Sequence, residues 1–361
     1  MDDTSKVVKR RDRDGRSRRT NVEDVAKLAG VSRATAARVF SDEHLVADAT
    51  KEKVRQAAKT LKYTPNALAR GLAGGRTNMI GVLWVFGSTP EAIGTTHLLA
   101  EELEQRQLMS YVTDMDVRET APIAMLQEFS QRNFDGIVLQ TNDVLALTNN
   151  PEFLDVLSSF RAVVLVSPKS LGLAFDEVVR DRLGAYREAA SHFAGSGRRR
   201  PAIMLAHHGE NIQKVETFFD EARRCGMEVL PDAIIDITKG HTFNPTYARN
   251  VLMTRFDGSD FPFDAVMCGN DELAMLTCAW LTKRGLRIPD DVALAGFDDM
   301  RISKVLNPPL ATADRRRKEV VDVITDLLTS RLDQPDLPIR SHKLPMQFIW
   351  RESAGECTNI E

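Results

Sequence analysis

Short apolar runs alternate with amphipathic stretches from Met79 to the end of the chain. This alternation is typical of a parallel sheet whose strands are joined by crossover helices. The expected strands are Ile80–Phe86, Ser110–Asp114, Gly136–Leu139, Ala162–Val166, Ala202–Ala206, Ala233–Ile237, Val266–Cys268 and Val292–Gly296. The expected helices are His97–Arg106, Pro122–Gln131, Arg182–Phe193, Ile212–Arg224, Asp271–Arg284 and Arg315–Leu332. About eight such units exceed one small doubly wound sheet, so we expect two linked subdomains with a ligand cleft at the carboxyl ends of the strands.

A different pattern precedes the body, with apolar positions at helical spacing in three short segments. Asn21 is a helix-capping residue, and it is followed by acidic residues and by Val22, Val25, Ala26, Leu28 and Ala29. Gly30-Val31 ends that helix, and Ser32 can cap a second helix over Arg33–Phe40. A third helix is expected from Asp48 to Leu61, with Val54, Ala57, Ala58 and Leu61 on one face.

Two short helices joined by a tight turn predict a helix-turn-helix, whose second helix fits the major groove of DNA. Small Ala34 and Ala37 allow close approach, and Arg33 and Arg38 flank them with guanidinium groups suited to guanine or phosphate. A three-helix bundle with a basic surface is the alternative interpretation. The candidate DNA-binding residues of this unit are Ser32, Arg33, Ala34, Thr35, Ala37 and Arg38.

The distribution of charge supports a polyanionic partner at one end of the chain. Residues 1–76 hold 18 Lys+Arg and 10 Asp+Glu, a net charge of +8, whereas residues 77–361 carry −11. Residues 1–19 lack apolar periodicity, so we expect a disordered basic arm that is a solvated tail, a source of phosphate contacts, or both. Pro65 can start a helix of one or two turns over Asn66 to Ala73, which Gly74-Gly75 ends and which needs a partner to be ordered.

From Asp24 the chain reads Asp24-Val25-Ala26-Lys27-Leu28-Ala29-Gly30-Val31-Ser32-Arg33 and continues to Phe40. This segment resembles the DNA-binding head of the LacI/GalR family of bacterial transcription regulators. Pro65-Asn66-Ala67-Leu68-Ala69-Arg70-Gly71-Leu72 resembles the hinge helix of that family, and the body resembles it through Asn270-Asp271 and Gly296-Phe297-Asp298. The resemblance implies an α/β fold with a helix-turn-helix head (20–64), a hinge helix and linker (65–76), and a periplasmic-binding-protein-like body of two subdomains with doubly wound parallel sheets (77–361). Ala36-Ala37 replaces the usual Val-Ser of the family, which changes the expected operator sequence.

The resemblance also assigns roles in the hinge. It implies that paired hinge helices of a dimer enter the minor groove and that Leu72 wedges between base pairs. Asn66, Leu68, Ala69 and Leu72 are therefore candidate DNA-binding residues. The alternative is that Leu68 and Leu72 pack on the body.

Four positions of the body are candidate effector ligands by the same resemblance. Asn270 and Asp298 match positions that hydrogen-bond a ligand, and these side chains suit hydroxyl groups. A helix cap for Asn270 and a turn for Asp298 are the alternatives. Lys214 stands where the family has an arginine, and Ser167 where it often has a carboxylate. A sugar acid or sugar phosphate is thus possible besides a neutral sugar, unless Lys214 faces solvent.

Several other classes of protein are disfavoured. The four cysteines form no C-x-x-C pair, no apolar stretch reaches the length of a membrane span, and the N-terminus lacks the apolar core of a secretory signal. We therefore expect a cytoplasmic protein without membrane contact. No phosphate-loop, nucleophile-elbow or zinc-protease motif is present, so we expect no enzyme and no cofactor. His207-His208 would point to opposite faces of a strand, which argues against a metal site.

These observations predict a homodimeric, sequence-specific transcription regulator, most often a repressor in this family, that binds a pseudo-palindromic operator in double-stranded DNA and responds to a small-molecule effector. Two alternatives remain. The first is a DNA-binding regulator with a degenerate cleft that a protein partner or its own abundance controls. The second is a solute-binding module with only loose affinity for DNA.

Overall fold

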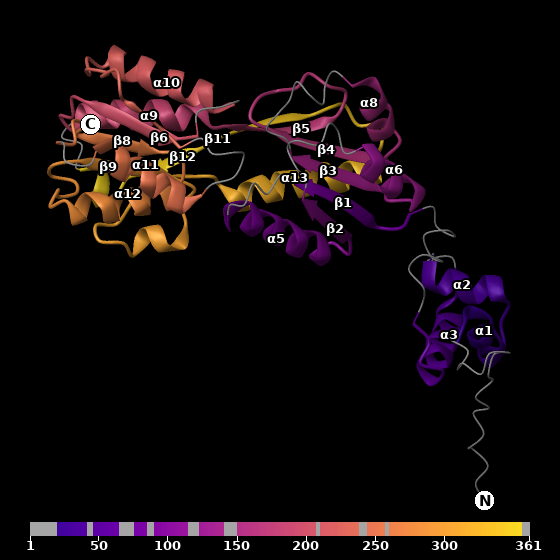
Figure 1. Cartoon of the computed structure of the whole chain (residues 1–361). Coiled ribbons are helices and arrows are strands. Elements are labelled where there is room, and N and C mark those ends of the chain that lie inside the picture. Colours follow the sequence, from indigo (N-terminus) through magenta and orange to yellow (C-terminus); the bar gives the residue numbers. More distant parts are fainter. Residues whose placement is uncertain are drawn as a thin grey trace, which may run out of the picture. The chain divides into compact units, whose positions relative to one another are not determined.

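The fold was analysed in a computed structural model of the 361-residue chain (Figure 1). The structure describes residues 20–41, 46–64, 76–84, 90–114, 123–140, 150–206, 210–237, 244–256 and 260–355. The chain divides into two compact units, Met1–Asn78 and Met79–Glu361. We call the first unit the head and the second the body, and each is described by itself.

The head packs three helices around a small apolar core. They are α1 (Val22–Ala29), α2 (Arg33–Ser41) and α3 (Asp48–Thr60). The buried residues of the core are Val25, Ala26, Ala36, Val39, Val54, Ala57 and Ala58. All three helices begin where the sequence predicts them, and their ends agree within one residue. Leu28 differs from the pattern, because it lies on the surface with 52% of its area exposed.

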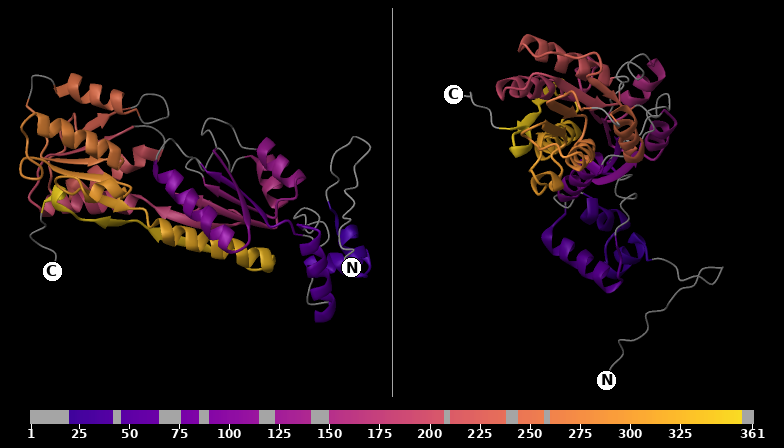
Figure 2. Two further views of the ribbon diagram at one scale, coloured as in Figure 1. Left: turned by 90° about the horizontal axis from the view of Figure 1, so that it is seen from below. Right: turned by 60° about the vertical axis from the view of Figure 1, so that its left-hand side comes forward.

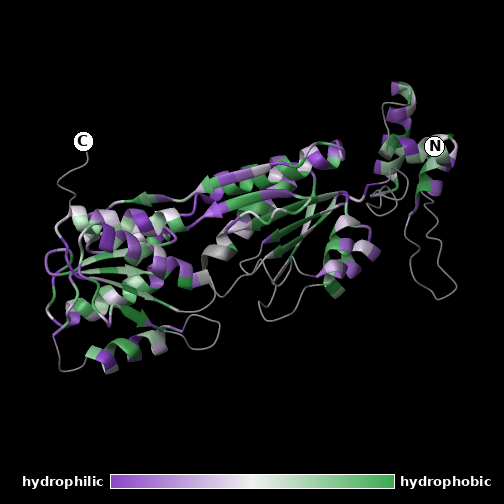
Figure 3. Ribbon diagram, turned by 90° about the horizontal axis from the view of Figure 1, so that it is seen from above, coloured by the Kyte–Doolittle hydropathy of each residue, from purple (hydrophilic) through white to green (hydrophobic). Residues whose placement is uncertain are grey.

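The first sheet of the body has the strand order β11-β5-β4-β3-β1-β2, and all its pairings are parallel. Its strands are β1 (Met79–Trp84), β2 (Met109–Asp114), β3 (Gly136–Gln140), β4 (Ala162–Ser167), β5 (Asp176–Asp181) and β11 (Ser341–Pro345). Helices α5 (Pro90–Gln105) and α13 (Arg317–Asp333) pack on one face, and α6 (Ile123–Gln131) and α8 (Pro151–Ser158) on the other. Its central strands are apolar on both sides, because each face is covered by helices (Figure 3).

The second sheet has the order β12-β10-β9-β8-β6-β7, in which β12 is antiparallel to β10 and the other pairings are parallel. Its strands are β6 (Pro201–Leu205), β7 (Ile234–Asp236), β8 (Ala265–Cys268), β9 (Ala293–Phe297), β10 (Ala311–Asp314) and β12 (Gln347–Ile349). The helices around it are α9 (Leu183–Gly195), α10 (Glu210–Arg224), α11 (Pro245–Phe256) and α12 (Asp271–Lys283). The short 3-10 helices η2 (Arg301–Lys304) and η3 (Glu352–Ala354) complete this subdomain.

The chain passes between the two subdomains three times (Figure 2). The first crossover joins β5 to α9, the second joins β10 to α13, and the third joins β11 to β12. Because α13 and β11 return to the first sheet after the second sheet has begun, both subdomains are built from segments that are distant in the sequence.

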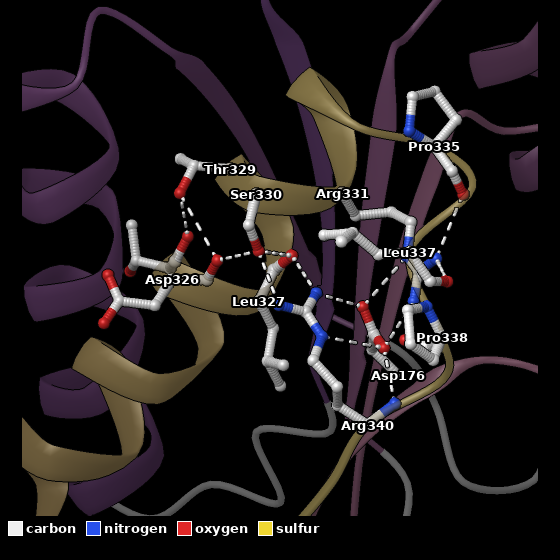
Figure 4. A network of polar contacts seen from close by, with 11 residues as sticks. Asp176, Asp326, Leu327, Thr329, Ser330, Arg331, Pro335, Leu337, Pro338 and Arg340 are labelled. Carbon is white, nitrogen blue, oxygen red and sulfur yellow. Dashed lines mark hydrogen bonds and ion pairs between the residues drawn. The ribbon is translucent and has the colours of Figure 1, made fainter.

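A buried carboxylate ties together the elements of the first subdomain that lead to these crossovers (Figure 4). Asp176, at the start of β5, has no exposed side-chain area and accepts 2.7 Å hydrogen bonds from Nη2 of Arg331 and Nη2 of Arg340. Arg331 lies on α13, and Arg340 directly precedes β11. We call Asp176, Arg331 and Arg340 the Asp176 clamp, and it joins β5, α13 and β11 at one point.

The structure corrects the expected secondary structure in several places. The eight expected strands are present within two residues at each described end. The sequence pattern did not predict strands β5, β10, β11 and β12 or helices α8 and α11. Helix α5 begins seven residues before the expected His97. Within the described parts of the chain, no helix is long and apolar enough to cross a membrane.

Candidate nucleic-acid interface and effector cleft

The start of α2 presents a polar surface. Ser32 caps this helix, since its Oγ accepts a 3.0 Å hydrogen bond from the backbone N–H of Thr35. Ser32, Arg33, Ala34 and Arg38 are exposed, and Thr35 and Ala37 are half-buried. Ala36 and Val39 on the opposite side enter the core of the head. The six expected DNA-binding residues of this helix are therefore accessible or partly accessible, and they lie on the first two turns.

The turn between α1 and α2 is fixed by local hydrogen bonds. A capping box joins Asn21 and Asp24 at the start of α1, with distances of 3.0 and 3.1 Å between side chain and backbone. Gly30 ends α1 with a φ of 68°, a conformation that favours glycine. The N–H of Val31 then donates to the carbonyl of Ala26 at 3.0 Å. The bonds at Gly30 and Val31 close the turn through which α1 leads into α2.

The expected hinge residues Asn66, Leu68, Ala69 and Leu72 lie outside the described residues, as do His207 and His208. Their roles remain predictions.

Two of the four expected effector residues lie at the carboxyl ends of adjacent strands of the second sheet. Asn270 follows β8 and caps α12, accepting a 2.8 Å hydrogen bond from the N–H of Leu273. The structure therefore confirms the alternative interpretation of Asn270 as a helix cap, and its contact with an effector stays a prediction. Asp298 directly follows β9, is 2% exposed, and pairs with Arg315.

The other two expected residues are anchored differently. Lys214 is half-buried on α10, and its Nζ donates to Oδ1 of Asn211 at 2.6 Å. Asn211 donates in turn to the carbonyl of Ala206, directly after β6, which brings the ammonium group towards the carboxyl edge of the sheet. Ser167 is buried at the end of β4, where its hydroxyl donates to the carbonyl of Lys169 at 2.7 Å.

A buried network holds the loop that carries Asp298. Asp271, at the first position of α12, accepts hydrogen bonds of 2.6 Å from the hydroxyls of Ser303 and Thr312 and one of 2.8 Å from the N–H of Met300. Burial raises the pKa of Asp271 above its ordinary value, although these hydrogen bonds favour the charged form. Asp298 and its neighbour Asp299 have positive φ angles of 129° and 46°, so the loop holds a backbone conformation that non-glycine residues rarely adopt.

Sequence reasoning missed a group of arginines at the crossovers. Arg180 and Arg182 are buried at the first crossover, and Arg315 lies over the ring of Phe297 at 5.6 Å. The run Arg315-Arg316-Arg317 is visible in the sequence, but nothing local shows that it directly follows a strand at the subdomain junction.

A cavity of about 960 Å³ opens beside the second crossover, with walls from both subdomains. Its lining residues are Gly94, His97 and Leu98 of α5, residues 299–302, Asp314, residues 316–319 and Gln347.

Comparisons with known proteins agree with both units. The family model described as bacterial regulatory proteins, lacI family, matches residues 21–66, and the model of a periplasmic binding protein-like domain matches residues 190–354. The HTH-type transcriptional repressor PurR of Haemophilus influenzae (strain PittEE) is 24% identical over 325 residues, which are 89% of this chain and 94% of PurR. The HTH-type transcriptional regulator DegA of Bacillus subtilis (strain 168) is 28% identical over 84% of this chain and 88% of DegA.

Among solved structures, the lac repressor dimer bound to operator and the anti-inducer ONPF matches with a TM-score of 0.77 and 18% identity. The match covers 93% of this chain and 99% of that one. These similarities extend over nearly the whole chain, head and body together.

Proposed function

Because the chain belongs to the lacI family of bacterial regulatory proteins, we propose that it is a cytoplasmic, sequence-specific DNA-binding repressor whose affinity for its operator changes when a small effector enters the cleft of the body. The observation that carries this proposal is the exposed, capped start of α2 on a head that the same chain joins to a two-subdomain body. The relatives named above are transcriptional regulators rather than enzymes.

The head would read DNA with α2 in the major groove. Arg33 and Arg38 would contact guanine edges or phosphates. Ala34 and Ala37 would allow the backbone to approach the bases, and Ser32 and Thr35 would contact phosphate. The hinge would act in the minor groove through Asn66, Leu68, Ala69 and Leu72, and Leu72 would insert between base pairs as a wedge.

The test of this assignment begins with selection of operator sequences from random DNA, followed by footprinting. We expect a pseudo-palindrome, because a two-fold dimer presents two identical heads. Arg38→Ala should lower the ratio of operator to random-DNA affinity by about 5- to 150-fold, the cost of one bidentate base contact. Lys59→Ala is the matched control, since Lys59 is exposed on α3, and it should leave the ratio unchanged. Equal effects of the two substitutions would contradict the assignment of α2.

The hinge requires a separate test. Leu72→Ala should weaken operator binding far more than binding to random DNA, because the wedge acts only where the duplex kinks. An equal loss on both kinds of DNA would exclude the wedge. Sequence-specific regulators bind their operator roughly 10³–10⁷ times more tightly than random DNA. If the unsubstituted protein bound both kinds of DNA equally, the solute-binding module with loose DNA affinity would be favoured.

The homodimer is supported by apolar side chains on the surface of the body. Strand β2 is the edge of its sheet and exposes Met109 and Tyr111 (62% and 56%). Ile93 on α5 and Val305 after η2 are 59% and 73% exposed. An exposed edge strand with large apolar side chains favours association, and a second copy of the same surface would cover it.

We propose that the effector binds between the two subdomains, at the carboxyl ends of the strands. Asp298 and Asn270 would bind hydroxyl groups, and Lys214 and Ser167 would complete the second and first subdomain walls. A sugar or a sugar derivative fits this set. Binding would change the angle between the subdomains and thereby the spacing of the hinges, a coupling of roughly 1–3 kcal/mol in such systems.

A further inference from the structure

One loop of the second subdomain joins the candidate effector cleft to the exposed apolar surface of the body. It runs from Asp298, directly after β9, to Val305, directly after η2, and we call residues 298–305 the β9 loop. Asp298 is 2% exposed, whereas Ile302 and Val305 are 43% and 73% exposed. A short segment of chain therefore separates a candidate effector ligand from the apolar side chains of the proposed homodimer contact, which we call the dimer surface.

Asp271 holds the middle of the β9 loop from the inside. The residue is fully buried, and its Oδ2 accepts hydrogen bonds of 2.8 Å from the N–H of Met300 and 2.6 Å from the hydroxyl of Ser303. Ser303 lies in η2, is also fully buried, and accepts a 2.8 Å hydrogen bond at its carbonyl from the N–H of Leu310. The outward side chains of η2 therefore keep their place as long as these bonds hold.

The other oxygen of the same carboxylate ties the cleft end of the loop to the sheet. Oδ1 accepts a 2.6 Å hydrogen bond from the hydroxyl of Thr312 on β10, and this hydroxyl accepts one of 3.2 Å from the N–H of Asp299. Gly296 leaves the space for Oδ1, because a Cβ at that position would overlap with it. Asp271 thus holds both the cleft end of the β9 loop and η2, and it directly follows the candidate ligand Asn270.

The β9 loop also contacts the elements that lead into the first subdomain. Nη2 of Arg317, at the start of α13, donates to the carbonyl of Asp299 at 3.4 Å. Asp298 pairs with Arg315, which directly follows β10 in the second crossover. Residues 299–302 line the cavity beside this crossover together with residues of α5. A change in the angle between the subdomains would therefore displace the contacts of this loop.

Building on the function proposed above, we propose that Asp271 is a positioning residue that couples the effector cleft to the dimer surface. An effector that contacts Asp298, or the subdomain closure that follows, displaces the β9 loop. Because the buried carboxylate of Asp271 holds this loop and η2 together, the displacement reaches Val305 and changes the affinity between the protomers. Coupling between two binding sites is reciprocal, so dimer formation also changes the affinity for the effector.

The first test compares two buried serines of the same subdomain by analytical ultracentrifugation of the full chain. Ser303→Ala removes the bond between η2 and Asp271, and it should raise the dimer Kd about 5- to 150-fold, because association then has to order η2 without this bond. Ser353→Ala is the matched control, because the Ser353 hydroxyl donates to the carbonyl of Leu294 and accepts from the N–H of Ala311, both outside the β9 loop. It should lower the Tm at least as much and leave the dimer Kd unchanged.

The second test perturbs the cleft end of the loop. Asp298→Asn removes the charge that pairs with Arg315, at a position that is not itself on the surface. Coupling predicts that this substitution changes the dimer Kd at least about 3-fold, and that the change disappears in a protein that also carries Asp271→Asn. The four proteins form a double-mutant cycle, which separates coupling from additive losses of stability. Ser303→Ala takes the place of Asp271→Asn in the cycle if circular dichroism shows that the latter does not fold.

The coupling is refuted if Ser303→Ala and Ser353→Ala have the same dimer Kd, or if Asp298→Asn has the same effect with and without Asp271. Val305→Arg separates this failure from a failure of the proposed dimer. If Val305→Arg gives monomers while Ser303→Ala leaves the dimer intact, only the coupling is wrong. If Val305→Arg remains dimeric, the proposed dimer surface is wrong and the coupling is refuted with it. A protein that still selects a pseudo-palindromic operator remains a regulator in both cases.

Discussion

The Asp176 clamp gives a quantitative prediction about the stability of the body. Asp176→Asn keeps the shape of the side chain but removes the charge that both Arg331 and Arg340 share (Figure 4). Asp176 has no exposed side-chain area, and the side chains of Arg331 and Arg340 are 11% and 29% exposed. The substitution therefore leaves two cations near each other, partly out of water, without their carboxylate.

The expected loss in the free energy of unfolding depends on the hydrogen bonds that the two arginines retain. Breaking a buried ion pair by removing one partner costs about 3–5 kcal/mol. Arg331 still donates to the carbonyls of Pro335 and Pro338 at 3.0 and 2.9 Å, and Arg340 to that of Leu327 at 3.0 Å. These bonds place the loss at the lower end, about 3 kcal/mol. For a unit of this size that is a decrease in Tm of roughly 6–12 °C.

The assay is thermal and urea unfolding of the full chain, followed by far-UV circular dichroism. Asp326→Asn is the matched control on α13, the helix that carries Arg331, because Asp326 pairs with Arg106 at 2.8 Å while its side chain is 70% exposed. An exposed pair contributes about 0–1 kcal/mol, so this variant should unfold close to the original protein. If Asp176→Asn loses no more stability than Asp326→Asn, the clamp does not hold the crossover elements together.

Three further predictions follow from other described residues. Hydrogen bonds from arginines lower the pKa values of several carboxylates, to about 2 for Glu221 and for Asp291. The pKa of Asp176 is also lowered, because the hydrogen bonds from Arg331 and Arg340 outweigh the effect of burial. These carboxylates contribute fully to the free energy of unfolding above the unfolded pKa values near 4, and the contribution is lost as pH falls towards 2. The urea midpoint should therefore decrease from about pH 5 downward, and a constant midpoint would show that the pairs do not form. Asn21→Ala removes the cap of α1 and should destabilise the head by about 1 kcal/mol in denaturant unfolding, whereas an unchanged midpoint would show that the capping box contributes nothing. Val305→Arg should convert the proposed dimer to monomers in analytical ultracentrifugation and weaken operator binding, while Ile339→Arg, at another exposed apolar position, should do neither; dimers in both variants would place the interface elsewhere.

The parts of this fold that local signals specify were predictable from the sequence. Asn21, Gly30 and Ser32 mark the ends of the head helices through hydrogen bonds within four residues, and the structure places α1 and α2 accordingly. The apolar strands β1, β3, β4 and β8 are recognisable because both of their faces are buried.

The crossover strands were not predictable in the same way. β5 reads Asp-Glu-Val-Val-Arg-Asp, and its buried first residue depends on Arg331 and Arg340, more than 150 residues later. β11 is largely exposed at the sheet edge and ends in Pro345, so it has no apolar alternation to detect. The positions of Asn270 and Asp298 could be expected, whereas the pairing of Arg315 with Asp298 depends on strand β10 lying beside β9 in the folded sheet.

The interleaving of the two subdomains also constrains how the protein is made. The first sheet receives its covering helix α13 and its edge strand β11 from residues 317–345, after the whole of β6 to β10 has been translated. At a synthesis rate of roughly 5–20 residues per second, on the order of 15–50 s pass between the synthesis of β1 and the synthesis of the last elements of its subdomain. Apolar residues of β1, β3 and β4 that α13 covers are exposed on the ribosome during that interval. A chain that terminates before residue 317 would therefore carry a complete head on an open sheet, a product for chaperones and proteases rather than a shorter repressor.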